Sequence, residues 1–238
     1  MSALRTQQVP SAAPNREAIP PLIAGDHLTR AEFERRYRAM PGVKKAELIE
    51  GVVYMPSPVS RSHGDPHANV VLWLNFFAAH TPGTRCGDNS TLRLDQLNEP
   101  QPDAHLRIVQ NLGGQVKVDA DDFLAGPPEL VAEVSLSSVS IDMHSKLQVY
   151  RRHGVREYVV WRVADGVIDW FFLNEGRFDP LPKTDGFYKS LVFPGLWLDD
   201  QATLAGDLPK VLATLQQGVA APEHAEFVAQ LAAADKAK

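Results

Sequence analysis

Short stretches in which apolar and polar residues alternate predict most of the strands in this chain. Alternation of this kind, typical of strands with one buried face, occurs in residues 84–95 and 102–109. Two further strands are predicted in residues 156–163 and 166–173. The last two stretches flank Asp165 and Gly166, a dipeptide that favours a β-hairpin turn. Residues 45–55, "KAELIEGVVYM", carry β-branched residues on both sides of Gly51 and favour a pair of strands that bends there.

The helical period predicts helices before and after these strands. Residues 28–40 contain Thr29 as a candidate N-cap and Glu32 at capping-box spacing. Residues 67–80, "HANVVLWLNFFAAH", are too apolar for a surface helix and predict one that is buried on most sides. The preceding "SHGDPH" is predicted to be a loop, because its Gly and its Pro are unfavourable in a regular helix.

The predicted elements fit one α/β domain, a mixed sheet flanked by helices, and 238 residues suffice for its core. The Pro, Ala and polar residues at the start predict a disordered leader over residues 1–22. The domain is expected to span residues 23–205, and residues 206–238 are expected to form a C-terminal helical extension. The tail from Pro222 is rich in Ala and is predicted to be a loosely attached helix.

Charge and composition narrow the class of protein. A net charge of −5 at pH 7 argues against a general nucleic-acid coat protein, but not against a nuclease that holds acidic metal ligands in its cleft. No apolar run approaches the roughly 18 residues of a membrane helix. The single Cys86 excludes an internal disulfide and a thiolate zinc site. We therefore expect a cytoplasmic protein that does not associate with membranes.

A carboxylate stands within an otherwise apolar strand. In residues 129–135, "ELVAEVS", alternation places Glu133 on the opposite face from Leu130, Ala132 and Val134. If this strand is central in the sheet, Glu133 cannot reach water. An unpaired buried carboxylate is costly, so such a residue is normally paired, protonated or bound to a cation.

The following segment can be helical and offers a lysine. Its apolar stripe consists of Val139, Met143, Leu147 and Tyr150. Asp142, Lys146 and His153 line one edge of the stripe, so the stem of Lys146 can lie along apolar surface and deliver its ammonium into a cleft. Alternatively, Lys146 forms an exposed i,i+4 pair with Asp142 and Glu133 is an edge-strand carboxylate.

Asp103 is a second candidate carboxylate. It follows Pro102 at the start of a predicted strand, where an Asp is usually a turn residue, but it would meet Glu133 if the two strands are neighbours. Two carboxylates and a lysine are the groups needed to hold Mg²⁺, to position a water on a phosphodiester and to offset charge during attack. A salt bridge from Glu133 to Lys146 or Arg156, with a purely structural role, is the competing interpretation.

The whole pattern resembles a known family. The pair Pro102-Asp103, then "ELVAEVS", then a helix with Lys146 and "YRRHGVREYVVW", is similar to the bacterial restriction endonuclease domain family of the PD-(D/E)XK nuclease superfamily. The upstream "ELIEGVVYMPSPVSRSHG" and the downstream "FPGLWLD" also match, so the resemblance covers roughly residues 28–205. It implies a restriction-endonuclease-like fold.

The resemblance also implies roles for residues. Asp103 and Glu133 would be the metal-binding acids, and Lys146 the catalytic lysine. The superfamily pattern places its lysine two residues after the acid, where this chain has Ser135; the family instead supplies the lysine from the next helix. Glu47 matches the acidic residue of the first element and would hold a water on the metal or orient Lys146.

Further residues are weaker candidates. Glu50 competes with Glu47, although the two would face opposite sides of a strand. His63 and His67 lie in the loop that this family places near its cleft, and they are candidates for contacting phosphate or supporting the metal ligands, as are Glu50 and Ser135.

The sequence thus predicts a Mg²⁺-dependent endonuclease, with Mn²⁺ as a substitute ion, that hydrolyses DNA phosphodiester bonds through a metal-activated water. Asp103, Glu133 and the backbone carbonyl of Val134 would bind the metal, and Lys146 would stabilise the pentacovalent state. The alternative function is a non-catalytic nucleic-acid or protein binding module that keeps the nuclease fold. DNA is the expected partner, and the resemblance to restriction enzymes suggests a homodimer.

Overall fold

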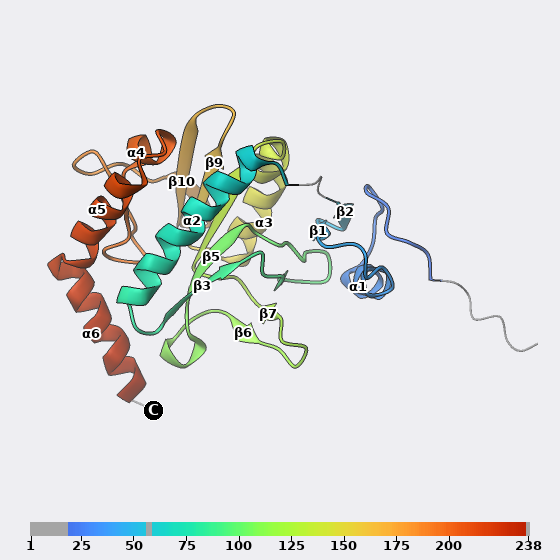
Figure 1. The fold of residues 1–238 in the computed structure, drawn as a ribbon. Helices are drawn as coiled ribbons and strands as arrows, with labels where there is room; N and C mark the ends of the chain where they lie inside the picture. The colour runs from blue at the N-terminus through green and yellow to red at the C-terminus, as the bar shows by residue number, and fades with distance from the viewer. Residues whose placement is uncertain (1–18, 56–58, 237–238) are drawn as a thin grey trace, which may run out of the picture.

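A six-stranded mixed sheet forms the centre of the computed structural model, which describes residues 19–55 and 59–236 (Figure 1). The spatial order of its strands is β11-β10-β9-β8-β5-β3. Their bounds are β3 Thr84–Asp88, β5 Ala104–Ile108, β8 Leu130–Ser135, β9 Glu157–Arg162, β10 Val167–Asn174 and β11 Arg177–Pro180. Strands β8 and β9 are parallel, and the other neighbouring pairs are antiparallel. The predicted class, a mixed sheet flanked by helices, is confirmed.

Helices pack on both faces of this sheet (Figure 1). The first face is covered by α2 (Arg61–His80), α4 (Asp200–Leu204), α5 (Leu208–Val219) and α6 (Pro222–Lys236). The π-helical segment η2 (Ile141–Lys146) continues directly into α3 (Leu147–His153), and together they connect β8 to β9 across the second face.

An N-terminal unit stands beside the sheet (Figure 1). It consists of α1 (Arg30–Arg38) and the hairpin of β1 (Glu47–Ile49) and β2 (Val52–Tyr54). The predicted bend lies at Glu50 and Gly51, which both have positive φ, as a tight two-residue hairpin turn requires. This unit has its own small core, made of Leu22, Phe33, Ala46, Leu48 and Val53. The remaining short elements are β4 Leu92–Arg93, η1 Gln110–Leu112, β6 Lys117–Val118, β7 Leu124–Ala125, β12 Tyr188–Lys189 and β13 Trp197–Leu198.

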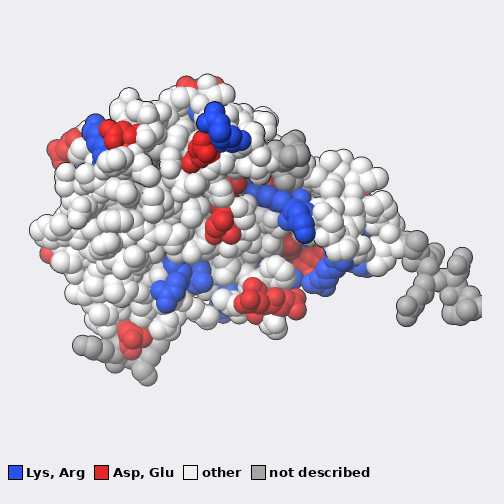
Figure 2. All heavy atoms as spheres, viewed as in Figure 1, with Lys and Arg blue, Asp and Glu red and all other residues white. Residues whose placement is uncertain are grey.

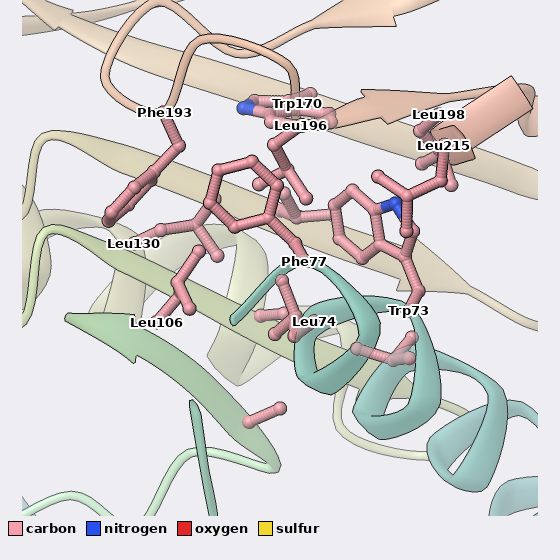
Figure 3. Close-up of a cluster of buried hydrophobic side chains, with 14 of the residues drawn as sticks. Trp73, Leu74, Phe77, Leu106, Leu130, Trp170, Phe193, Leu196, Leu198 and Leu215 are labelled. Atoms are coloured by element: carbon pink, nitrogen blue, oxygen red, sulfur yellow. The ribbon is translucent and has the colours of Figure 1, made fainter. Parts of the chain in front are cut away.

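The main core lies between the sheet and α2 (Figure 3). Trp73, Leu74 and Phe77 of α2 face Leu106 of β5 and Leu130 of β8, as the apolar stretch 67–80 predicts. On β8 the predicted alternation is confirmed, because its even-numbered residues lie in this core whereas Val131 packs with Tyr150 and Tyr158 on the opposite face. Glu133 therefore points to the side of the sheet that carries η2 and α3.

One local prediction at a helix start is wrong, and a second is confirmed only in part. The "SHGDPH" segment is not a loop, because α2 begins at Arg61 and includes Pro66. A proline so near the N-terminus removes only one helical hydrogen bond, and the buried turns that follow offset this loss. At α1, Thr29 is the N-cap residue, but its side chain makes no capping hydrogen bond. Glu32 instead accepts hydrogen bonds from Arg35 and Arg36.

The C-terminal helix is firmly attached, contrary to the prediction. Phe227 and Leu231 of α6 are 8% and 5% exposed and belong to the main core. His224 shares a 2.9 Å hydrogen bond with Thr81 at the end of α2. The predicted leader falls largely on residues 1–18, which lie outside the described residues. Among the described residues, no helix is both long enough and apolar enough to cross a membrane.

Candidate active site

A cleft of about 1010 Å³ lies between the N-terminal unit and the sheet. Residues 43–45 and β2 line it on one side, and the first turns of α2 and residues 136–142 line it on the other. Glu47, Asp103, Glu133 and Lys146 also line it. Figure 2 shows Lys and Arg atoms at the hollow between the N-terminal unit and the main body. With His63 and His67 of α2, the cleft thus contains six residues that the sequence marks as candidates.

Strand register brings Asp103 and Glu133 together. Ala104 of β5 is paired with Ala132 of β8, so the adjacent residues Asp103 and Glu133 lie opposite each other on one face. The backbone N–H of Asp103 donates to Glu133 Oε2 at 3.4 Å, and the N–H of Val134 donates to Asp103 Oδ2 at 2.9 Å. Only 6% of Asp103 and 3% of Glu133 are exposed. The meeting of the two carboxylates is therefore observed, whereas their role as metal ligands stays a prediction.

Lys146 is buried among three carboxylates. Its Nζ lies 2.9 Å from Glu47 Oε1, 3.0 Å from Glu133 Oε1 and 3.5 Å from Asp142 Oδ1. The alternative of an exposed pair with Asp142 is wrong, because both side chains are almost fully buried in η2. The competing salt bridge from Glu133 to Lys146 is present. It is only one of three contacts of the ammonium.

Ser135, which the sequence marks as a candidate, and Tyr150 and Ser138, which it does not, complete this cluster. The hydroxyl of Tyr150 donates to Glu133 Oε1 at 2.9 Å. The hydroxyls of Ser135 and Ser138 both donate to Asp142 Oδ2, at 2.5 Å each. Tyr150 belongs to the predicted apolar stripe, and it is fully buried. Its position four residues after Lys146 places it on the same side of the helix, which is the signal that could have revealed it.

Glu47 belongs to the buried cluster, whereas Glu50 lies on the surface. Glu47 Oε1 accepts a hydrogen bond from the backbone N–H of Gln101 at 2.8 Å in addition to its contact with Lys146. Glu50 lies in the hairpin turn, is largely exposed and pairs with Arg152 at 2.8 Å. The structure therefore does not bring Glu50 into the cluster, because the turn directs its side chain to the surface.

His63, His67 and Lys45 surround Asp103. The Nε2 atom of His63 is 3.3 Å from Asp103 Oδ2, and that of His67 is 2.9 Å from the backbone oxygen of Asp103. Because both histidines lie on α2 four residues apart, they form the helical pair that the predicted loop excluded. Lys45, which the sequence analysis missed, places Nζ 3.4 Å from Asp103 Oδ1.

These contacts shift the ionisation of the two carboxylates in opposite directions. Burial would raise the pKa of Asp103, but hydrogen bonds from His63 and the Val134 N–H and the charge of Lys45 hold it well below its usual range. Burial raises the pKa of Glu133 to about 8, opposed by Lys146 and aided by the neighbouring carboxylates. Burial would lower the pKa of Lys146, but the three carboxylates around it raise this pKa well above its usual value.

The oxygen donors at Asp103 and Glu133 fit a small divalent cation. Within residues 19–55 and 59–236, no three His, Cys, Asp or Glu side chains are arranged to hold a metal ion. Mg²⁺ does not need such a cage, since it prefers one or two carboxylates and keeps several waters. The carbonyl of Ser135 accepts from Val163 on the β9 side, so strand alternation turns the backbone of Val134 toward Asp103. The carboxylates of Asp103 and Glu133 and the backbone carbonyl of Val134 form a suitable donor set for Mg²⁺.

Comparison with known proteins identifies the family. A family model described as "Uma2: Putative restriction endonuclease" matches residues 30–202. The chain belongs to this family. The Uma2 match supports a nuclease in general terms. It confirms the resemblance seen in the sequence.

A solved structure supports the fold. The crystal structure of a protein titled a putative nuclease from Anabaena variabilis ATCC 29413 aligns with a TM-score of 0.52 at 11% sequence identity. The alignment covers 76% of this chain and 97% of that chain. The restriction-endonuclease-like fold predicted for the Uma2 protein is confirmed. No curated protein matches the chain.

Proposed function

We propose that this Uma2 protein is a Mg²⁺-dependent endonuclease that hydrolyses the phosphodiester bonds of DNA. The observation that carries the proposal is the pairing of Asp103 with Glu133 across β5 and β8, with Lys146 Nζ 3.0 Å from Glu133, inside one cleft. Nuclease family membership and the restriction-endonuclease-like fold support the same reaction class.

The charge balance of the cleft favours a divalent cation. Four buried carboxylates, those of Glu47, Asp103, Glu133 and Asp142, face two lysines, Lys45 and Lys146. Full ionisation would leave an excess of two negative charges at low exposure, which is costly unless protons or a cation compensate. A single Mg²⁺ ion has the charge that neutralises this excess.

Asp103, Glu133 and the carbonyl of Val134 would hold Mg²⁺, and Mn²⁺ could substitute because it accepts the same oxygen ligands. When bound there, the ion would polarise the phosphodiester and lower the pKa of water. Tyr150 donates to Glu133 Oε1, so Oε2 is the oxygen of Glu133 that faces Asp103.

Lys146 would stabilise the charge that develops on the phosphate. Its ammonium is positioned by Glu47, Glu133 and Asp142, and it would exchange the longest of these contacts, 3.5 Å to Asp142, for a hydrogen bond to a phosphate oxygen. Lys45 and His63, which contact Asp103 here, would instead contact phosphate. In this proposal Lys146 stabilises the charge that develops during attack, and Lys45 and His63 bind the incoming phosphate.

The test combines calorimetric titration of Mg²⁺ and Mn²⁺ with plasmid nicking on the same samples. We expect Asp103→Asn and Glu133→Gln to lose metal binding and nicking, because each removes a carboxylate ligand. Glu50→Gln is the matched control, since Glu50 is a nearby glutamate outside the cluster, and it should behave as the wild type. Lys146→Met should still bind metal but lose nicking by at least about 100-fold.

Two results would contradict this proposal in different ways. Equal metal binding by the wild type and Glu133→Gln would leave Glu133 with a purely structural role. Normal metal and DNA binding without nicking by the wild type would favour the alternative, a binding module that keeps the nuclease fold.

A further inference from the structure

Tyr54 lies opposite Glu47, the residue whose carboxylate contacts the proposed catalytic lysine. It is the cross-strand partner of Glu47 in the β1–β2 hairpin, so both side chains lie on the same face of the hairpin. Glu47 Oε1 is 2.9 Å from Lys146 Nζ, and Tyr54 itself lines the cleft. An aromatic side chain thus lines the cleft opposite Glu47, which contacts the lysine.

The ring of Tyr54 is free for a ligand. It is half-buried, and no other residue of the described part of the chain forms a hydrogen bond or ring contact with it. By contrast, Tyr150 and Tyr158 are fully buried and both donate hydrogen bonds from their hydroxyls. Tyr54 is therefore not explained as a core residue or as part of the polar cluster.

The wall around Tyr54 combines apolar and cationic side chains. Val43, Val52 and Met55 line the same side of the cleft, together with Lys44 and Lys45. An aromatic ring beside cations is the composition that binds unpaired nucleotides, with bases stacking on the ring and lysines tracking the phosphates. In a duplex the base faces are stacked on one another, so only base edges and phosphates would meet this wall.

The depth of the site also selects against a duplex. Asp103, Glu133 and Lys146 are almost fully buried, so a phosphodiester has to enter the cleft to reach them. The cleft volume of about 1010 Å³ is at the upper end of the range of roughly 300–1,000 Å³ for small-molecule sites. One unpaired strand can enter such a space without carrying its complement with it.

We propose that the site takes single-stranded or locally unpaired DNA and that Tyr54 stacks on the base beside the phosphodiester at Asp103 and Glu133. This inference rests on the proposed nuclease function for the identity of the phosphodiester site. The stacking itself is a property of binding and can be measured without cleavage.

The test measures the fluorescence anisotropy of a labelled single-stranded oligodeoxynucleotide and of its duplex, with Ca²⁺ in place of Mg²⁺ because Ca²⁺ also takes oxygen ligands. The single strand should bind at least about 10-fold more tightly than the duplex. Tyr54→Ala should weaken single-strand binding by about 5- to 150-fold, the loss expected for the stacking of one base, and should leave duplex binding unchanged. Tyr54→Phe should bind as the wild type does.

A second measurement reports stacking directly. An oligonucleotide that contains 2-aminopurine should lose fluorescence on binding to the wild type and to Tyr54→Phe, but not on binding to Tyr54→Ala. Leu191→Ala, which truncates an exposed apolar residue outside the cleft lining, is the control and should match the wild type.

The outcomes separate this inference from the proposed function. Equal or tighter binding of the duplex, or unchanged binding and quenching in Tyr54→Ala, would overturn the inference. Metal-dependent nicking of intact duplex that Tyr54→Ala does not affect would leave the nuclease function standing and the inference overturned. The expected binding results in Ca²⁺, together with no cleavage in the nicking assay with Mg²⁺ or Mn²⁺, would support the inference and overturn the nuclease function.

Discussion

Replacing Lys146 by Met tests whether its ammonium compensates the buried carboxylates. The substitution keeps an unbranched apolar stem and removes a charge that lies 2.9 Å from Glu47, 3.0 Å from Glu133 and 3.5 Å from Asp142. Removing one partner of a buried ion pair costs about 3–5 kcal/mol. Because three carboxylates lose the same partner, we expect the free energy of unfolding to fall by at least this amount at pH 8.

The loss should depend on pH in a defined direction. Without the ammonium, the folded-state pKa of Glu133 rises further above the ordinary value of 4.5, so the folded variant binds protons that the unfolded chain does not. A carboxyl with a raised folded pKa is favourable at low pH, and its contribution is lost as pH rises. Because the pKa of Glu133 is already about 8 in the wild type, both proteins should lose stability between about pH 4.5 and pH 8. The additional loss in Lys146→Met should appear above about pH 8, at about 1.4 kcal/mol per pH unit for each proton retained.

Urea denaturation of matched variants at about pH 5, pH 8 and pH 9.5 measures both effects. Lys44→Met is the control, because Lys44 is an exposed lysine of the same cleft, and it should change stability by less than about 0.5 kcal/mol. The double variant Lys146→Met with Glu133→Gln should recover about 1–3 kcal/mol of the lost free energy of unfolding, since it also removes one of the buried carboxylates left without a cationic partner. A Lys146→Met protein as stable as the wild type at pH 8, with an unchanged pH profile, would refute this account of the cluster.

Two further predictions concern stability away from the cleft. Burial raises the pKa of Glu157 to about 7 despite hydrogen bonds from Ser190 and the Leu191 N–H, so its favourable contribution at low pH is lost between about pH 4.5 and pH 7. Urea denaturation across this window should show a loss of up to about 3 kcal/mol in the wild type that Glu157→Gln lacks, and parallel profiles would contradict it. Phe227→Ala should lower the free energy of unfolding by about 3–5 kcal/mol in the same assay, whereas a change under about 0.5 kcal/mol would mean that α6 is loosely attached after all.

The hydrophobic pattern predicted the sheet better than the helix ends, for a physical reason. Alternation in residues 129–135 decides which side of β8 faces the core, and a strand with one face in a large core has little freedom to deviate. The start of α2 depends on a smaller balance. Pro66 costs one hydrogen bond, and the contacts of His63 and His67 with Asp103 come from a strand more than thirty residues away. Local propensity contains no information on such contacts.

The candidate site was predicted in part for the same reason. Asp103, Glu133 and Lys146 could be selected because each is a charged residue in a position where the pattern is apolar or the backbone turns. Tyr150 was not separated from core residues, because it is fully buried in the apolar stripe and only its spacing of four residues from Lys146 indicates a polar contact. Lys45 was missed because its contact with Asp103 depends on how the N-terminal unit lies against the sheet, and this placement has no periodic signature.

Ser135 is connected to Lys146 through the carboxylate of Asp142. The superfamily pattern places lysine at that strand position, whereas here the hydroxyl of Ser135 donates to Asp142 Oδ2 at 2.5 Å. The other oxygen of Asp142 lies 3.5 Å from Lys146 Nζ. The strand position thus still orients the lysine, through one carboxylate rather than by carrying it. Because Ser138 donates to the same oxygen, Asp142 is fixed from both the strand and the start of the helix, and a lysine on a helix gains the restraint that a strand would otherwise provide.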